Sequence, residues 1–326
     1  MARWWVLLGV IGGGCTKLNP TFPLDPDPAD TRGTQTASSS TGAALTSGGP
    51  ETSGTAGPTT EHSSTTVPAA TTGVSTTTEP GTTLEPGTTE PDTTAATTGE
   101  PACLGVCGTP GCSACPEGPT VDLGEFSIDA REVSGEAYAL FLADDVALDS
   151  QPPMCAWNTT FVPSEWPPSK LTLPVVWVDW CDAFAYCRWA GKRLCGKIAG
   201  GPADFTKPTL PSDQWYAACA GPSQWIYPYG PTFNVDACNS GFDGMPGLVP
   251  SGGFPDCQGS PPGLYDMSGN VWEWVDACDG DGMESQCLRR GGSFYTDLEK
   301  DLRCDLQSYR PRTTALDHVG LRCCSK

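Results

Sequence analysis

Seventeen cysteines constrain this chain more than any other feature of its sequence. Cys15 closes a short apolar segment, residues 1–15, and the other sixteen cysteines lie between residues 103 and 326. An even number of cysteines in an exported chain predicts an oxidising compartment and a framework of up to eight disulfides. Soluble cytosolic chemistry is therefore not expected.

The amino-terminal segment predicts export and lipidation. Residues 1–15 combine one arginine, a short apolar run and small residues before Cys15, which is typical of a lipoprotein signal peptide and too short to span a bilayer. The position three residues before Cys15 is Gly12, where such signals usually have a branched aliphatic residue, so an ordinary signal peptide cut near Cys15 remains the alternative. With Cys15 diacylated, we expect a lipoprotein anchored in a membrane, at the outer membrane or cell surface.

Residues 16–102 have the composition of a linker. Thr, Pro, Gly, Ser and Ala dominate the segment, and aromatic residues are almost absent. Such a segment buries too little apolar surface to offset its chain entropy, which predicts disorder. Its coil span of roughly 50 Å would hold the rest of the chain away from a membrane.

Residues 103–120 contain "CLGVCGTPGCSAC", in which four cysteines are closely spaced. Zinc binding is one interpretation of this spacing, but in an exported chain we expect two small disulfides that form a knot. The segment 121–326 then has enough residues for one hydrophobic core.

The charge balance excludes one class of partner. The chain carries a formal charge of −20, of which −12 falls in residues 121–326, from 15 Lys and Arg against 27 Asp and Glu. Nucleic acid is not expected on so acidic a surface, whereas cations are. The acidic balance has a simpler alternative role, which is to keep the protein soluble.

Regular secondary structure is expected to be sparse and of α+β type. "EFSIDAREVS" (125–134) alternates as a strand does, and "GEAYALFLA" (135–143) continues as a short helix. Residues 179–194 predict a second helix that stops at Gly191, and residues 210–221 a third, with Ser212 as its N-cap and Gly221 at its end. Beyond residue 221, Gly, Pro, Asn and Asp recur so often that no long element is expected.

Seven motifs, in order, carry a family resemblance. They are "FSIDAREVS", "PVVWVDWCDAFAYCRWAGKRL", "WYAACAG", "YPYG", "GLYDMSGNVWEW", "RRGGSF" and "GLRC". Together they resemble the sulfatase-modifying factor family, the formylglycine-generating enzymes and their relatives, over residues 121–326. The resemblance implies a loop-rich variant of the C-type-lectin fold that disulfides and calcium stabilise.

The resemblance assigns calcium to the segment around "GNVWEW". The implied ligands are the carboxylates of Asp266 and Glu273 and the backbone carbonyls of Gly269 and Val271. Calcium prefers such oxygen ligands on flexible, glycine-containing loops, and a bound cation would remove the cost of placing Glu273 between Trp272 and Trp274. The alternative is that Glu273 pairs with Arg289 or Arg290.

A second calcium site is implied at Asn239 and Asp243, on a loop shorter than the one in the well-known enzymes. The alternative is that both are turn residues. The resemblance also implies two disulfides, Cys187–Cys323 and Cys219–Cys304. Cys278 and Cys287 flank an acidic loop and are expected to pair locally, and Cys238–Cys257 is a further expected pair.

Copper is not expected. The oxidases of this family hold Cu(I) on two cysteines in the pattern RGGS-x2-C-x4-C, whereas this chain reads "RGGSFYTDLEKDLRCD" and has Thr296 and Asp301 at those places. A hydroxyl and a carboxylate are hard ligands and cannot replace two thiolates on Cu(I).

The small number of histidines further limits the kinds of metal and catalytic site that the chain can form. The chain has only His62 and His318, so three-histidine iron sites and paired-histidine zinc sites are excluded. A Ser-His-Asp triad would require His318, which we take as a packing or surface residue. We therefore expect a lipid-anchored domain that binds an unidentified protein or glycan, or has a structural role, at the cell envelope. The competing hypotheses are a sulfatase-modifying oxidoreductase and a calcium-dependent glycan-binding protein.

Overall fold

The computed structural model describes residues 103–326 except 208, 210, 243, 245 and 246. The predictions for the signal segment 1–15, for Cys15, for the linker 16–102 and for Asp243 lie outside the described residues.

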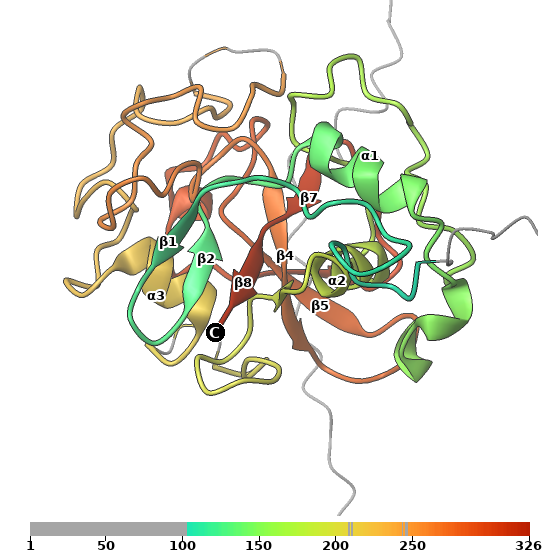
Figure 1. Cartoon of the computed structure of the whole chain (residues 1–326). Coiled ribbons are helices and arrows are strands. Elements are labelled where there is room, and N and C mark those ends of the chain that lie inside the picture. The colour runs from blue at the N-terminus through green and yellow to red at the C-terminus, as the bar shows by residue number, and fades with distance from the viewer. Residues whose placement is uncertain (1–102, 208, 210, 243, 245–246) are drawn as a thin grey trace, which may run out of the picture. The chain divides into compact units, whose positions relative to one another are not determined.

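The regular structure of the described residues consists of two four-stranded sheets and three short helices (Figure 1). The first sheet has the order β1 (Thr120–Asp122), β2 (Ser127–Asp129), β8 (Cys323–Ser325), β3 (Arg193–Leu194). The second has the order β6 (Ser308–Pro311), β5 (Gln286–Arg290), β4 (Trp272–Cys278), β7 (Val319–Leu321). Only β4 and β7 pair in parallel among these strands. The described residues also form three 3-10 helices, which are η2 (Leu148–Ser150), η3 (Pro153–Cys155) and η4 (Glu299–Leu302). The fold is mixed α and β and rich in loops, as expected.

The helices begin at side-chain caps. α1 (Gly135–Ala143) starts at Ser134, and α2 (Trp180–Trp189) starts at a capping box of Asp179 and Asp182. α3 (Gln214–Ala220) begins at Asp213, whose Oδ1 accepts the amide of Tyr216 at 2.9 Å. The prediction of Ser212 as this cap was wrong by one residue, because Asp213 is an equally good capping residue and stands where its oxygen reaches the third amide.

The carboxy-terminal part holds more regular structure than predicted. β4 is seven residues long and pairs with both β5 and β7. Its side chains are buried almost throughout, so its sequence lacks the alternation of apolar and polar residues that marks a strand with one exposed face.

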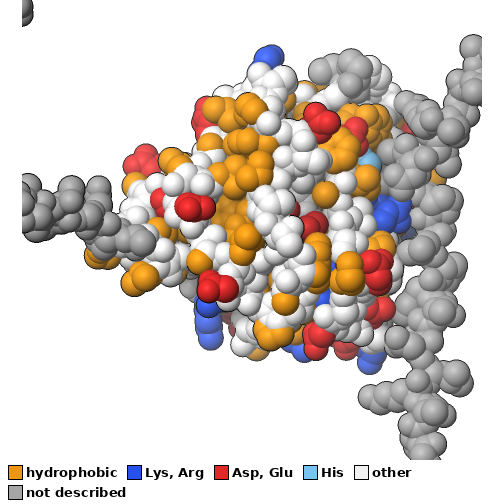
Figure 2. Space-filling view, turned by 90° about the vertical axis from the view of Figure 1, so that its right-hand side faces the viewer, with side chains coloured by type: hydrophobic (Ala, Val, Ile, Leu, Met, Phe, Trp, Pro, Cys, Tyr) orange, Lys and Arg blue, Asp and Glu red, His pale blue; other side chains and the backbone are white. Residues whose placement is uncertain are grey.

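The surface shows where apolar side chains remain exposed. On the face in Figure 2, hydrophobic side chains gather in a band, and acidic side chains are scattered around it. Among the described residues, no helix has the length and apolar character that crossing a membrane requires.

All sixteen cysteines between residues 103 and 326 form disulfides. The bonds are Cys103–Cys112, Cys107–Cys115, Cys155–Cys181, Cys187–Cys323, Cys195–Cys324, Cys219–Cys304, Cys238–Cys257 and Cys278–Cys287. The four expected pairs of the domain are among them, and the cysteine-rich knot closes on itself. The structure adds Cys155–Cys181 and Cys195–Cys324, which the sequence left unassigned.

The knot is docked on the helices by Asp144. The carboxylate of this residue accepts hydrogen bonds from the amide and hydroxyl of Ser113, at 2.7 and 2.6 Å, and from Trp189 Nε1 at 2.7 Å. The amide of Cys107 also donates to the carbonyl of Trp189 at 2.9 Å. The knot is therefore a part of the same folded body as the helices.

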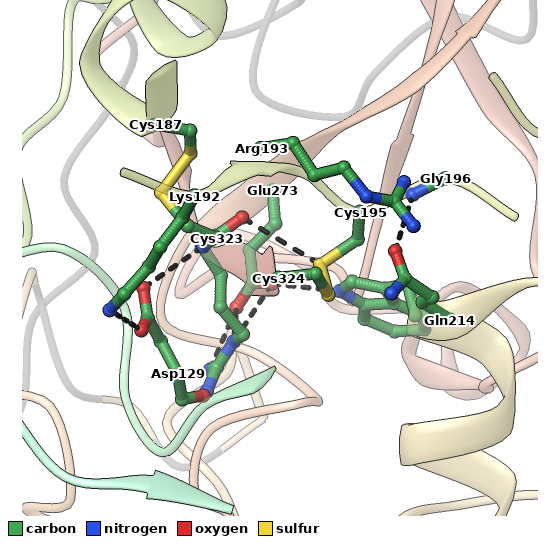
Figure 3. Close-up of a disulfide and its surroundings, with 12 residues drawn as sticks. Asp129, Cys187, Lys192, Arg193, Cys195, Gly196, Gln214, Glu273, Cys323 and Cys324 are labelled. Atoms are coloured by element: carbon green, nitrogen blue, oxygen red, sulfur yellow. Dashed lines mark hydrogen bonds and ion pairs between the residues drawn. A yellow bond between two sulfur atoms is a disulfide. The ribbon is translucent and has the colours of Figure 1, made fainter. Parts of the chain in front are cut away.

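The last strand joins the two main hydrophobic cores. Successive residues of a strand point to opposite faces, so Cys323 enters the core that contains Cys187, and Cys324 enters the core that contains Cys195 (Figure 3). Asp129 of β2 also holds β8 in place, because its carboxylate accepts a hydrogen bond from the amide of Cys323 at 3.1 Å.

Candidate functional site

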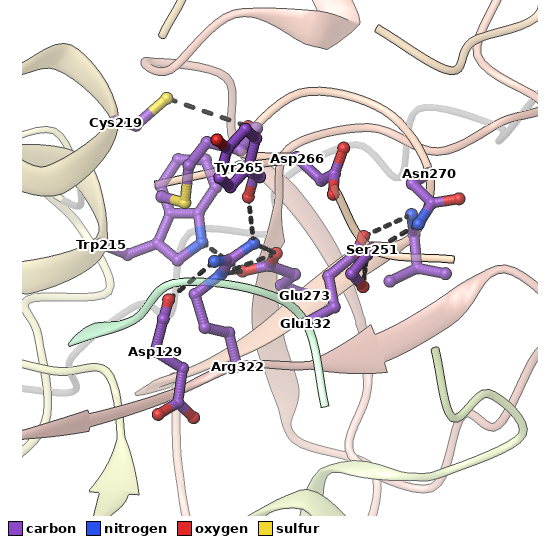
Figure 4. Close-up of polar contacts among 12 residues, drawn as sticks. Asp129, Glu132, Trp215, Cys219, Ser251, Tyr265, Asp266, Asn270, Glu273 and Arg322 are labelled. Carbon is purple, nitrogen blue, oxygen red and sulfur yellow. Dashed lines mark hydrogen bonds and ion pairs between the residues drawn. The ribbon is translucent and has the colours of Figure 1, made fainter. Parts of the chain in front are cut away.

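A buried ion pair lies at the "GNVWEW" segment. Glu273 of β4 and Arg322, which follows β7, are 1% and 0% exposed. Arg322 donates from Nη2 and Nε to Glu273 Oε1 at 2.9 and 3.0 Å, and from Nε to Oε2 at 3.1 Å (Figure 4). Trp215 Nε1 donates to Oε2 at 2.7 Å. The cation that compensates Glu273 is thus an arginine of the "GLRC" motif.

The two arginines proposed as alternative partners lie elsewhere. Arg290 faces Asp213, with 3.5 Å between Nη2 and Oδ2. Arg289 stacks over the ring of Trp272, with its guanidinium carbon 4.5 Å from the ring centroid. The alternative that an arginine pairs with Glu273 therefore holds, but the arginine is Arg322 and neither of the two that were named, although Glu273 and Arg290 are cross-strand neighbours in the backbone ladder.

Two further carboxylates surround this pair. Glu132 accepts from Ser251 Oγ at 2.6 Å, from Asn270 Nδ2 at 2.7 Å and from the amide of Val271 at 3.1 Å. Burial raises the pKa of Glu132 well above its usual range, and the nearby charges of Asp266 and Glu273 raise it further. Burial likewise raises the pKa of Asp266 to about 6. Three carboxylates thus surround the buried Arg322, with Arg131 acting on Asp266 as well, and the cluster favours protonation or an added cation.

The calcium ligands implied by the family fit this cluster unequally. Asp266 is buried and accepts the amide of Gly252, but no described residue donates to its Oδ1. That oxygen is available to calcium. Glu273, in contrast, already receives donors on both oxygens, so an ion there would share them with Arg322 and Trp215. Asp266 therefore suits a calcium ion better than Glu273 does, while the carbonyls of Gly269 and Val271 stay predicted ligands.

The second implied calcium residue lies beside the first site. Asn239 is fully buried, donates to Asn270 Oδ1 at 2.9 Å and accepts the amide of Asn270 on its carbonyl at 2.8 Å. Gly269 approaches this carbonyl so closely that a Cβ would stand 2.1 Å from it. None of the described residues donates to Asn239 Oδ1. The structure thus brings Asn239 and the 269–270 turn together.

The two places that correspond to the copper cysteines flank one glycine. A Cβ on Gly292 would lie 2.9 Å from the carbonyl oxygen of Asp301 and 3.3 Å from Thr296 Oγ1. Thr296 is buried, and its hydroxyl accepts the amide of Ser293 at 2.9 Å, so it closes a turn. Asp301 lies in η4 and contacts Lys300 at 3.4 Å. Cys304, the nearest cysteine along the chain, is bonded to Cys219.

A groove with a volume of about 500 Å³ opens beside this turn. It is lined by Glu165, Pro167, Pro168, Ser169, Leu173, Val176, Trp177, Leu248, Phe294 and Asp317. Phe294 stands two residues before Thr296. Of the described lining residues two are acidic and none is basic, so the groove is apolar with an acidic edge. Its size is in the range of sites for small ligands.

Asp317 is held in place at the edge of this groove. Its Oδ1 contacts Nδ1 of His318 at 2.6 Å, and its Oδ2 accepts the hydroxyl of Tyr295 at 3.1 Å. The rings of Tyr295 and His318 meet edge to face with centroids 5.4 Å apart. His318 is buried, as expected of a packing residue, and it orients a groove carboxylate.

Sequence reasoning missed Arg322 and the groove. Arg322 had a usable signal, because an arginine inside the apolar "VGLRCC" run must have a buried partner. Trp177 and Phe294 had no such signal, since they come together from segments more than 100 residues apart.

Comparisons with known proteins give a family match and several relatives. The family described as "Sulfatase-modifying factor enzyme 1-like domain" (FGE-sulfatase) matches residues 75–326. A mouse protein named "Inactive C-alpha-formylglycine-generating enzyme 2" is 32% identical over 193 residues, which cover 53% of this chain and 56% of the relative. The match thus spans about half the length of that relative.

This chain is also similar to an enzyme and to a solved structure. The formylglycine-generating enzyme of Thermomonospora curvata is 28% identical over 277 residues, covering 64% of this chain and 84% of the enzyme. The structure of PvdO from Pseudomonas aeruginosa aligns with a TM-score of 0.44 at 20% identity, over 62% of this chain and 80% of PvdO.

Proposed function

This chain belongs to the FGE-sulfatase family, and on that premise we propose that it is an exported, lipid-anchored member whose domain is a non-catalytic binding or structural module at the cell envelope. The observation that carries the proposal is the pair of residues beside Gly292. Thr296 and Asp301 occupy the places of the copper cysteines, and the Thr296 hydroxyl is committed to the amide of Ser293.

The cysteine inventory supports this proposal. Cu(I) requires soft ligands such as thiolates. All sixteen cysteines in the described part of the chain are disulfide-bonded, so this part offers no thiolate pair beside the groove. The mouse relative whose name includes "inactive" shows that the family has members of that kind.

Export and anchoring rest on the amino-terminal sequence. Residues 1–15 have the pattern of a lipoprotein signal, and residues 16–102 have the composition of a spacer. Eight disulfides in the described domain suit an oxidising compartment. In the proposed arrangement, the lipid on Cys15 anchors the chain in the membrane, and the domain presents its groove to a protein or glycan.

Calcium enters the proposal as a structural ion. When bound, it would supply positive charge next to Asp266, where three carboxylates surround the buried Arg322. Asn239 and the 269–270 turn would form the adjoining loop.

The competing function is oxidation of the formylglycine-generating type, which the Thermomonospora curvata relative favours. The test is to supply the full-length chain with Cu(I), oxygen and a sulfatase-type Cys-x-Pro-x-Arg peptide, and to follow the mass of the peptide. We expect no conversion of its cysteine to formylglycine, with a formylglycine-generating enzyme as positive control. Conversion by this chain, and its loss in Thr296→Ala, would overturn the proposal and place an active site at this turn.

A further inference from the structure

We propose that the groove beside Thr296 binds a small organic cation that carries a trimethylammonium group. This inference rests on the proposed function, in which the domain is a binding module, and it assigns the groove to a small cation in place of the protein or glycan named there. It follows from the strain of one lining residue, from the two aromatic side chains of the groove and from its one-sided charge.

Trp177 is the strained residue. Its φ is +62°, in the left-handed region that bulky residues avoid. A hydrogen bond from its amide to the carbonyl of Leu316, at 2.9 Å, holds this conformation. Backbone strain of this kind persists where the surroundings impose it, and it gathers at ligand sites. Here the strained backbone places the largest aromatic side chain of the groove in its lining.

The walls of the groove suit methyl groups. Phe294 lines the groove together with Trp177, and Pro167, Pro168, Leu173, Val176 and Leu248 complete the apolar surface. Aromatic faces attract cations through the ring quadrupole, and quaternary ammonium groups are recognised in this way. A trimethylammonium group requires no hydrogen-bond acceptors in compensation for lost water, unlike a primary ammonium. The groove therefore matches the quaternary ion better.

The charges of the groove are all of one sign. Glu165 and Asp317 are acidic, and the described lining residues include neither Lys nor Arg. Tyr295 and His318 contact the two oxygens of Asp317 and keep the carboxylate at the groove. Another cavity, of about 400 Å³, has four acidic lining residues but also two basic ones, Arg131 and Lys192, and Lys192 pairs there with Asp129. The 500 Å³ groove is thus the better site for a cation.

The experiment compares choline with 3,3-dimethylbutan-1-ol, its uncharged isostere, by isothermal titration of the full-length chain. We expect choline to bind at least about tenfold more tightly than the isostere, because only choline gains from the rings and carboxylates. Two variants locate the site. Trp177→Gly retains a residue that tolerates positive φ but removes the ring, and Glu165→Gln removes one exposed charge. Both should weaken choline binding several-fold, whereas Glu136→Gln, at the other cavity, should leave it unchanged.

The outcomes separate this inference from the proposed function. Equal binding of choline and the isostere, or tighter binding of Nα-acetyl-lysine methylamide than of choline, overturns the trimethylammonium inference and leaves a binding module with another ligand. Absence of choline binding up to 50 mM also overturns the inference. Only peptide oxidation, measured separately, overturns the module itself.

Discussion

Arg322 binds Glu273 through two nitrogens while both side chains are almost completely buried. The remaining donors of the guanidinium reach the carbonyls of Asp129 and Tyr265, at 2.8 and 2.7 Å, so the arginine ties both sheets and the loop before β4 to one point. This contact explains how a carboxylate is tolerated between two tryptophans. It also leaves Asp266, rather than Glu273, as the carboxylate with an oxygen to spare.

Arg322→Met should destabilise the domain strongly. The change leaves Glu273 buried without its cation, next to Glu132 and Asp266, and loss of one partner of a buried pair costs about 3–5 kcal/mol. Urea unfolding of the purified chain measures the difference. The matched control is Arg303→Met, because Arg303 pairs with Asp305 while both side chains are about 40% exposed, and the expected cost is below about 1 kcal/mol. Equal losses in the two variants would contradict the assignment.

The disulfides should differ in how much they contribute to the free energy of unfolding, according to the length of the loop that each one closes. Cys187–Cys323 spans 136 residues and Cys278–Cys287 spans 9. Chain entropy predicts that replacing the first pair by serine costs roughly 2 kcal/mol more in free energy of unfolding than replacing the second. Thermal denaturation of the two double-serine variants makes the comparison. A larger loss for the short loop would show that the acidic loop, and not chain entropy, dominates.

Stability should rise as the pH falls from 8 towards 5. Burial raises the pKa of Asp179, Asp266 and Asp276 to about 6. A carboxyl whose pKa is higher in the folded state binds protons more tightly there, so its stabilising contribution is complete below its unfolded pKa and is lost as the pH rises through 6. Melting temperatures measured in EDTA across this range test the sign. Asp276→Asn should flatten the slope, and a stability that increases towards pH 8 would refute the prediction.

Calcium should stabilise the domain through Asp266. At calcium concentrations well above its dissociation constant we expect about 1–3 kcal/mol, seen as a melting temperature several degrees above that in EDTA. Asp266→Asn should abolish the shift. Asp281→Asn, in the exposed acidic loop, should retain it. A shift that survives in Asp266→Asn would place the ion elsewhere.

Local signals predicted local structure well. The helices at 135–143 and 180–189 follow from apolar spacing and from Gly191, which has the positive φ of a helix stop. β4 escaped prediction because burial on both faces removes its alternation. The α+β class and the disulfide framework were confirmed.

The site was less predictable because its contacts are distant in sequence. Glu273 and Arg322 are separated by 49 residues and meet only because β7 pairs in parallel with β4. The sequence favoured calcium at Glu273, and the arginines named as the alternative, Arg289 and Arg290, are closer along the chain than Arg322. Thr296 and Asp301 could be assigned because they follow a recognisable motif. The strain at Trp177 comes from its positive φ, a property of the backbone that no residue pattern predicts.

The adjacent cysteines of β8 have a consequence for the timing of maturation. Cys187 and Cys195 find their partners 136 and 129 residues later in the sequence, at Cys323 and Cys324. A chain that is synthesised from its amino terminus can therefore form these two native disulfides only after β8 has been made. The neighbouring cysteines of β8 thus make the covalent closure of both hydrophobic cores a late step of maturation.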